Sequence, residues 1–343
     1  MDALLVDRWP GDLERLTIFD QASLSEARER ARAAAAAAGL STEIAGAVAI
    51  VASELASNHL RHAREGLIAV RTMRRAGVPG VEIVAADRGP GIGSPTAAIE
   101  RGASTAGGLG VGLAAVLRLA DEVDVDVRLG EGTCIRARKF QSLQRRREVG
   151  VIGRPIDGER VSGDDVAFTR TDDELLVAVA DGLGHGAEAR AAAAMAVEAA
   201  LAARARGLDT ILGEAGEALE HTRGAAMSLV RVDERDETLG HAGVGNVTTH
   251  VVGPSVDRAF SGRAAVLGVR PRGGQRAPGR GHGETSMHLG QWDVVVVFTD
   301  GLTSRARLDG RETAERRRPS LIADTLLSRF GRSHDDATVV VIA

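Results

Sequence analysis

Two apolar runs that each end in an aspartate followed by a glycine constrain the fold of this chain most strongly. The first run covers residues 175–180 and leads to Asp181, and the second covers residues 294–299 and leads to Asp300. Short runs rich in Val, Leu and Ala are typical of strands that are buried on both faces. The sequence therefore predicts a sheet-based C-terminal half in which carboxylates lie at the edge of a sheet.

Further carboxylates accompany these two. Asp164 follows Ser162-Gly163, and Asp335-Asp336 precede an apolar run that ends the chain. The separations of 17, 119 and 35 residues (181 − 164, 300 − 181, 335 − 300) mean that folding alone can bring these groups together. Converging carboxylates bind hard cations, and a pair of such ions about 3.5–4 Å apart activates a water for attack on a phosphoryl group. Because no Cys and few His lie nearby, Mg²⁺ or Mn²⁺ is favoured over Zn²⁺.

Composition limits the class of protein. A chain of 343 residues with 44% hydrophobic residues predicts about two globular domains. Aromatic residues make up only 2% and the net charge is −4, which argues against a nucleic-acid partner. The single cysteine, the lack of a basic N-terminal signal region and the lack of a spanning apolar run predict a cytoplasmic protein without a membrane partner.

The order of expected elements divides the chain into two α/β (α+β) domains. Residues 1–139 are expected to hold two helices, then strands, a Gly-rich loop, a third helix and a hairpin. Residues 140–148 are polar and basic and are interpreted as a linker, and residues 149–343 are expected to hold strands, a helix pair and more strands. The pattern Ser23-x-x-Glu26 predicts the start of the first helix as a capping box.

Three motifs in the N-terminal half indicate a nucleotide site. Glu54 and Asn58 are four residues apart on an expected helix, so they share one face. An Asn amide oxygen can bind Mg²⁺, and a neighbouring Glu can deprotonate an attacking group. Asp87 ends an expected strand before a glycine turn, where its carboxylate could accept a hydrogen bond from an amine such as that of adenine.

The third motif is the glycine-rich run 107–113, which opens an expected helix. Glycines let the backbone approach a phosphate, and a helix N-terminus offers unpaired N–H groups. A single Gly-rich turn before a helix more often only separates two secondary-structure elements and binds nothing. No Walker-type Gly-Lys-Ser/Thr follows the run. The order of all three motifs, closed by Gly130-Glu131-Gly132-Thr133, is hard to obtain by chance.

With these motifs, residues from about Leu16 to Lys139 resemble the GHKL ATPase fold, a two-layer α/β sandwich, and most closely the RsbT-type serine/threonine switch kinases. The resemblance implies ATP with Mg²⁺ as the cofactor, Glu54 as the catalytic base and Asn58 as the Mg²⁺ ligand. It also implies that Asp87 reads adenine. The residues that it implies around the nucleotide are Gly89, Gly91, Gly108, Gly110, Gly112 and Thr133.

The C-terminal half, from about Val149 to Ala343, resembles the metal-dependent PPM phosphatases of the SpoIIE/RsbX/RsbU branch, which fold as an αββα sandwich. The resemblance rests on the segments at 162–164, 180–186, 240–246, 298–302 and 335–339. It implies two Mn²⁺ or Mg²⁺ ions and a catalytic role for Asp181. The implied metal ligands are Asp164, Asp181, the Gly182 carbonyl, Asp300 and Asp335, with the choice between Asp335 and Asp336 left open.

The two resemblances together imply a bifunctional partner-switching regulator. One domain would phosphorylate a Ser or Thr of a STAS-type anti-sigma antagonist or a stressosome-like protein, and the other would remove such a phosphate. In a second interpretation the N-terminal domain is an ATP-gated binding module and the phosphatase is the only enzyme. In a third, both sites are inactive and the protein is a scaffold. The sequence does not indicate the oligomeric state.

Overall fold

The computed structural model describes residues 14–63, 66–94, 96, 111–142, 146–171, 173–269, 284–308 and 318–343. The chain divides into two compact units, Met1–Ile152 and Gly153–Ala343. The division falls inside strand β6 (Val149–Arg154). No helix within the described ranges is both long enough and apolar enough to cross a bilayer.

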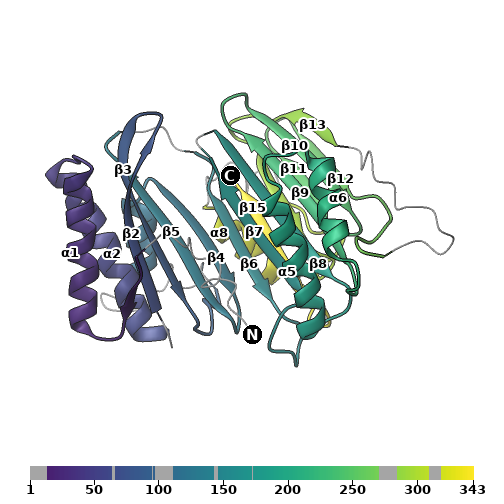
Figure 1. Ribbon diagram of the computed structural model, residues 1–343, viewed down its shortest axis with the longest axis horizontal. Helices are drawn as coiled ribbons and strands as arrows, with labels where there is room; N and C mark the ends of the chain where they lie inside the picture. The colour runs from purple at the N-terminus through teal and green to yellow at the C-terminus, as the bar shows by residue number, and fades with distance from the viewer. Residues whose placement is uncertain are drawn as a thin grey trace. The chain divides into compact units, whose positions relative to one another are not determined.

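The N-terminal unit is a two-layer α/β sandwich, as the sequence predicts (Figure 1). Its strands are antiparallel and follow the spatial order β1 (Leu16–Ile18), β2 (Gly66–Arg75), β3 (Val78–Asp87), β5 (Gly132–Phe140) and β4 (Glu122–Arg128). Helices α1 (Gln21–Ala37) and α2 (Thr42–His62) pack together against this sheet, and α4 (Val111–Leu119) packs against α2. Because β3 pairs with β5, the end of β3 lies opposite the start of β5.

The start of α1 differs from the prediction. The N-cap is Asp20, three residues before the expected cap, and Ser23 occupies the third helical position. The Asp20 carboxylate accepts a hydrogen bond from the Ser23 amide at 2.7 Å, and the Ser23 hydroxyl accepts one from the Asp20 amide at 3.1 Å. A reciprocal capping box therefore exists, but an aspartate begins it.

The C-terminal unit is an αββα sandwich, which confirms the predicted fold class. One sheet has the order β13 (Thr285–His288), β10 (Thr238–Val244), β9 (Ala225–Asp233), β8 (Glu174–Gly182) and β7 (Asp164–Arg170). Helices α5 (Gly186–Ala202) and α6 (Leu208–Ala218) cover it (Figure 1). In the other sheet β15 (Ala337–Ile342), β14 (Val294–Phe298), β11 (Thr248–Val252) and β12 (Asp257–Ser261) are neighbours, and α8 (Pro319–Phe330) packs on β15.

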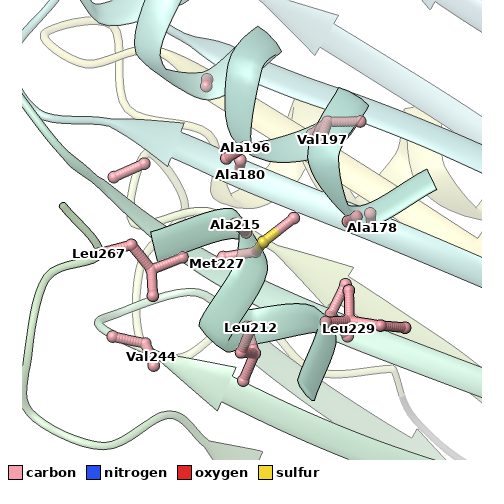
Figure 2. Close-up of a cluster of buried hydrophobic side chains, with 14 of the residues drawn as sticks. Ala178, Ala180, Ala196, Val197, Leu212, Ala215, Met227, Leu229, Val244 and Leu267 are labelled. Atoms are coloured by element: carbon pink, nitrogen blue, oxygen red, sulfur yellow. The ribbon is translucent and has the colours of Figure 1, made fainter. Parts of the chain in front are cut away.

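Small side chains let α5 lie close to its sheet. With so few aromatic residues in the chain, alanines fill the contact between the helix and β8, and Figure 2 shows this packing. Deep burial of many small apolar groups stabilises the fold by about 25 cal/mol per Å² of apolar area removed from water. The buried residues labelled there are Ala178, Ala180, Ala196, Val197, Leu212, Ala215, Met227, Leu229, Val244 and Leu267.

A buried polar contact joins the two sheets of the C-terminal unit. The hydroxyl of Ser228 on β9 lies 2.8 Å from the hydroxyl of Thr249 on β11 and 3.2 Å from Nε2 of His241. Burial lowers the pKa of His241 to about 4, so this imidazole is neutral at physiological pH. Because its ring bonds to Ser228, His241 supports the packing of the sheets.

Candidate functional site

The N-terminal unit brings Glu54, Asn58 and Gly112 together. The two polar residues lie one turn apart on α2, and Gly112 lies in the first turn of α4. A Cβ atom added at Gly112 would come within 3.0 Å of both Glu54 Oε2 and Asn58 Oδ1. The glycine therefore leaves the space beside both polar groups open, where a larger residue would fill it. Gly108 and Gly110 lie outside the described residues.

Asp87 is held at the end of β3 by main-chain donors. Its Oδ1 accepts a hydrogen bond from the Gly89 amide at 2.7 Å, and the Thr133 amide, on the facing residue of β5, also bonds to the carboxylate. Burial raises the pKa of Asp87 to about 6, and these two hydrogen bonds act in the opposite direction. The carboxylate is thus mostly ionised at pH 7 and able to accept a further hydrogen bond.

Two glycines in the turn after Asp87 occupy positions with no room for a side chain. A Cβ at Gly89 would lie 2.7 Å from Asp87 Oδ1. Gly91 has a φ of +75°, and its added Cβ would lie 2.8 Å from the carbonyl oxygen of Arg128. Both predicted glycines therefore let the main chain pass close to neighbouring groups, which gives the turn its shape.

Sequence reasoning missed His59. This buried imidazole follows Asn58 directly, and its Nε2 lies 3.9 Å from Asp87 Oδ2. Burial lowers the pKa of His59 to about 4, so it faces the carboxylate as a neutral ring. Its position beside the expected Mg²⁺ ligand was the only signal in the sequence that could have indicated it.

In the C-terminal unit, strand register places Asp164 and Asp181 side by side. The two residues are direct partners in the antiparallel pair β7–β8, so their side chains lie on the same face. Thr299, which follows β14 in the other sheet, donates its hydroxyl to Asp164 Oδ2 at 2.8 Å. The same hydroxyl accepts a hydrogen bond from the Thr338 amide at 3.0 Å, which ties the site to β15.

The predicted carboxylates gather around Asp181. Burial, and then repulsion from the other four aspartates, raises the pKa of Asp181 to about 9. The four that act on it come from segments far apart in the chain and are Asp164, Asp300, Asp335 and Asp336. Such a concentration of negative charge needs a proton or a cation to balance it.

The residues present fit divalent cations. All the converging side-chain donors are oxygens, which Mg²⁺ and Mn²⁺ prefer. Within the described part of the chain, no three His, Cys, Asp or Glu side chains are already closed around a common point as ligands.

Asp335 and Asp336 differ in their surroundings. Both carboxylate oxygens of Asp336 accept main-chain hydrogen bonds, from the amides of Ile156 and Gly163, each at 2.8 Å. Asp335 bonds through Oδ1 to the Asp336 amide at 3.0 Å. Asp336 is therefore engaged in holding the loop before β7, whereas Asp335 acts on Asp300 by charge repulsion.

Two glycines allow the turns after Asp181 and Asp300 to pack closely. A Cβ at Gly182 would lie 1.9 Å from the carbonyl oxygen of Ala189 on α5, and a Cβ at Gly301 would lie 1.9 Å from the carbonyl oxygen of Asp336. The glycine after each strand-end aspartate is therefore required by close packing and is more than a turn signal.

Asn246 is a second residue whose contact the sequence did not reveal. Its side-chain amide donates to Asp300 Oδ2 at 2.6 Å. Asn246 follows β10 at the end of a Gly-rich segment that the resemblance includes, so the motif was visible but its contact was not. The hydrogen bond fixes the orientation of the Asp300 carboxylate.

Comparison with known proteins supports both halves of this description. The family model of the histidine kinase-like ATPase domain matches residues 19–139, and that of stage II sporulation protein E matches residues 171–343. The chain is 36% identical over 129 residues to the serine/threonine-protein kinase RsbT of Bacillus subtilis (strain 168), which is 38% of this chain and 97% of the relative.

Two further similarities concern a phosphatase and a solved structure. The chain is 28% identical over 99 residues to the phosphoserine phosphatase RsbX of the same organism, covering 29% of this chain. It spans 50% of RsbX, about half of that relative's length. A structure described as the bacterial stressosome, a modular system adapted to control secondary messenger signalling, is 27% identical with a TM-score of 0.52, covering 57% of this chain and 99% of that one.

The chain therefore belongs to the stage II sporulation protein E family, whose model matches half of it, and its N-terminal unit belongs to the histidine kinase-like ATPase domains. The C-terminal unit is a PPM-type serine/threonine phosphatase domain, and the N-terminal unit is homologous to the RsbT kinase. Both resemblances noted in the sequence are confirmed. Domains of these two families imply the use of ATP and of divalent metal ions.

Proposed function

We propose that the protein is a bifunctional partner-switching enzyme that adds and removes phosphate on Ser or Thr of a STAS-type anti-sigma antagonist or stressosome-like protein. The observation that carries the proposal is the convergence of carboxylates from separate segments around Asp181. The similarity to a serine/threonine kinase in one unit and to a phosphoserine phosphatase in the other supports the pairing of activities. Residues 1–139 would form the kinase-like domain, 140–148 the linker and 149–343 the phosphatase.

The phosphatase site would hold two Mg²⁺ or Mn²⁺ ions. Bound there, the ions would supply a water of lowered pKa and neutralise charge on the phosphoryl oxygens. The residues that would hold them are Asp164, Asp181, the carbonyl of Gly182, Asp300 and Asp335. Asp335 is preferred over Asp336 because main-chain amides already occupy both oxygens of Asp336.

In the proposed hydrolysis, the oxygen of a water forms a bond to phosphorus while the ester bond from phosphorus to the seryl or threonyl oxygen breaks. The leaving oxygen takes a proton, and the products are the free hydroxyl and orthophosphate. Asp181 would orient the attacking water. Asn246 and Thr299 would hold Asp300 and Asp164 in place through the hydrogen bonds described above.

The kinase site would bind Mg-ATP between α2, α4 and the turn after β3. Asn58 would hold the Mg²⁺ ion, and Glu54 would take the proton of the attacking Ser or Thr hydroxyl as the γ-phosphoryl group is transferred. The carboxylate of Asp87 would accept a hydrogen bond from the adenine amine. The remaining nucleotide contacts would come from Gly89, Gly91, Gly108, Gly110, Gly112 and Thr133.

The two activities can be tested separately in the full-length protein. With Mn²⁺, the wild type is expected to hydrolyse a phosphoseryl peptide, and Asp181→Ala should abolish the reaction. With labelled ATP and a purified STAS-domain protein, the wild type should transfer phosphate, and Glu54→Ala should abolish transfer while keeping ATP binding. Each variant serves as the control for the other, because it alters only one unit.

Three results would change the proposal. Transfer that persists in Glu54→Ala would remove this residue from the role of base. ATP binding without transfer by the wild type would leave the N-terminal unit as a nucleotide-gated binding module. A folded, Mn²⁺-loaded wild type that neither hydrolyses the peptide nor transfers phosphate would overturn both assignments in favour of a scaffold.

A further inference from the structure

Arg332 is fixed against the turn that carries Asp300. Its amide donates to the Gly301 carbonyl at 2.7 Å, and Leu302 forms an antiparallel bridge with Gly331. The Thr303 amide adds a hydrogen bond to the carbonyl of Phe330 at 3.0 Å. The main chain that leaves α8 is therefore held against the Asp300 turn, so the fold fixes the backbone position from which the Arg332 side chain extends.

The guanidinium group lies beside Asp300 without pairing with its carboxylate. Arg332 Nη1 donates a long hydrogen bond, 3.4 Å, to the main-chain carbonyl of Asp300. The carboxylate of Asp300 is bonded instead by Asn246.

A phosphatase site that holds two metal ions would need a positive charge at its edge to bind a phosphoryl group. Four ligand carboxylates and the neighbouring Asp336 contribute −5 and two divalent ions contribute +4, so the metal-loaded cluster would carry a net charge of −1. A phosphoserine brings about −1.5 to −2. A guanidinium at the edge of the cluster supplies the missing positive charge, and its fork of N–H groups matches two phosphate oxygens.

We propose that Arg332 binds the phosphoryl group of the substrate and positions it over the metal cluster beside Asp300. This inference rests on the proposed phosphatase function and adds a substrate-binding residue to it. A purely structural role predicts something different. If Arg332 only tied the end of α8 to the Asp300 turn, its removal would lower stability and metal binding together and would leave phosphate recognition unchanged in the protein that remained folded.

The test compares Arg332→Ala and Arg332→Lys with the wild type. The matched control is Arg329→Ala, which removes the same charge from an exposed position on α8 where the side chain stacks over Phe330 at 5.2 Å. The measurements are KM and kcat for a phosphoseryl peptide and for 4-nitrophenyl phosphate, the inhibition constant of orthophosphate, and Mn²⁺ affinity by calorimetry.

In Arg332→Ala, we expect KM and the orthophosphate inhibition constant to rise roughly 10- to 100-fold, the range for loss of a charged hydrogen bond. Mn²⁺ affinity should be unchanged or higher, because a cation near the ions is gone. Arg332→Lys should recover part of the loss, since it restores charge without the fork. Arg329→Ala should behave as the wild type.

Unchanged KM and orthophosphate inhibition in Arg332→Ala would overturn the inference, and so would a parallel loss of Mn²⁺ affinity and stability that fully explains weaker binding. An inactive wild type would count against the proposed function instead. In that case, orthophosphate binding to the Mn²⁺-loaded protein, measured by calorimetry, still decides the role of Arg332. Equal orthophosphate affinity in the wild type and in Arg332→Ala would reject it.

Discussion

The replacement Asp181→Asn should stabilise the C-terminal unit when metal is absent. In the folded protein the pKa of Asp181 is about 9, against an ordinary value of 3.8. A raised pKa means that the group contributes stability below about pH 4 and loses it progressively as pH rises to about 9. At pH 8 the ceiling on this loss is (8 − 3.8) × 1.36, or about 6 kcal/mol.

The neighbouring aspartates can move apart in a metal-free protein, so we expect a gain of about 1–3 kcal/mol for the variant at pH 8. The gain should shrink at pH 5, which lies only 1.2 units above the ordinary pKa of 3.8, because the ceiling there falls to (5 − 3.8) × 1.36, or about 1.6 kcal/mol. Divalent metal should reverse the order. At a concentration of 100 times Kd, Mn²⁺ stabilises the protein that binds it by about 2.7 kcal/mol, and Asp181→Asn should gain little.

Urea denaturation followed by circular dichroism, with and without Mn²⁺, measures these differences. The transition that Mn²⁺ shifts in the wild type identifies the C-terminal unit, since two units need not unfold together. Asp236→Asn, an exposed turn position in the same unit, is the control for loss of one negative charge. The reasoning fails if metal-free Asp181→Asn at pH 8 is no more stable than this control.

Three other predictions concern the turns and the nucleotide site. The affinity for ATP should fall roughly tenfold between pH 7 and pH 5, because Asp87, with a pKa of about 6, gains a proton. The control is Asp87→Asn, which should bind ATP weakly at both pH values, so that any change that remains in this variant measures the titration of the nucleotide itself. Gly112→Ala would place a methyl group 3.0 Å from Glu54 and Asn58, so calorimetry should show Mg-ATP affinity about tenfold lower in a folded protein. Gly301→Ala would bring a Cβ to 1.9 Å from a main-chain oxygen, so denaturation should show a loss of about 3 kcal/mol in the C-terminal unit.

Much of the fold could be predicted because its signals are local. The apolar run before Asp181 is a buried strand, β8, and the run before Asp300 is β14 followed by a turn. The four-residue spacing of Glu54 and Asn58 puts them on one face of α2, where both approach Gly112. In each case the composition of a short segment and the period of its hydrophobic residues indicate the secondary structure of that segment.

Long-range contacts were harder to predict even where the motif was visible. The resemblance implied Asp335 as a ligand and left the choice between Asp335 and Asp336 open. In the structure the two differ, because Asp336 accepts hydrogen bonds from the amides of Ile156 and Gly163, which lie about half the chain away. The contact of Asn246 with Asp300 likewise joins β10 to the other sheet. Even the cap of α1 was misplaced, because Ser23 can begin a helix or serve as the third residue of one.

The sequence by itself determined which segments become strands and helices, which strand ends carry carboxylates and which families the chain resembles. Only the tertiary structure decided which carboxylates meet, which of them are already engaged by main-chain amides and which arginine lies beside the cluster. The physical reason is that a hydrophobic period records the environment of each residue, whereas the partner of a side chain depends on strand register and sheet packing. Those depend on the whole core rather than on any one motif.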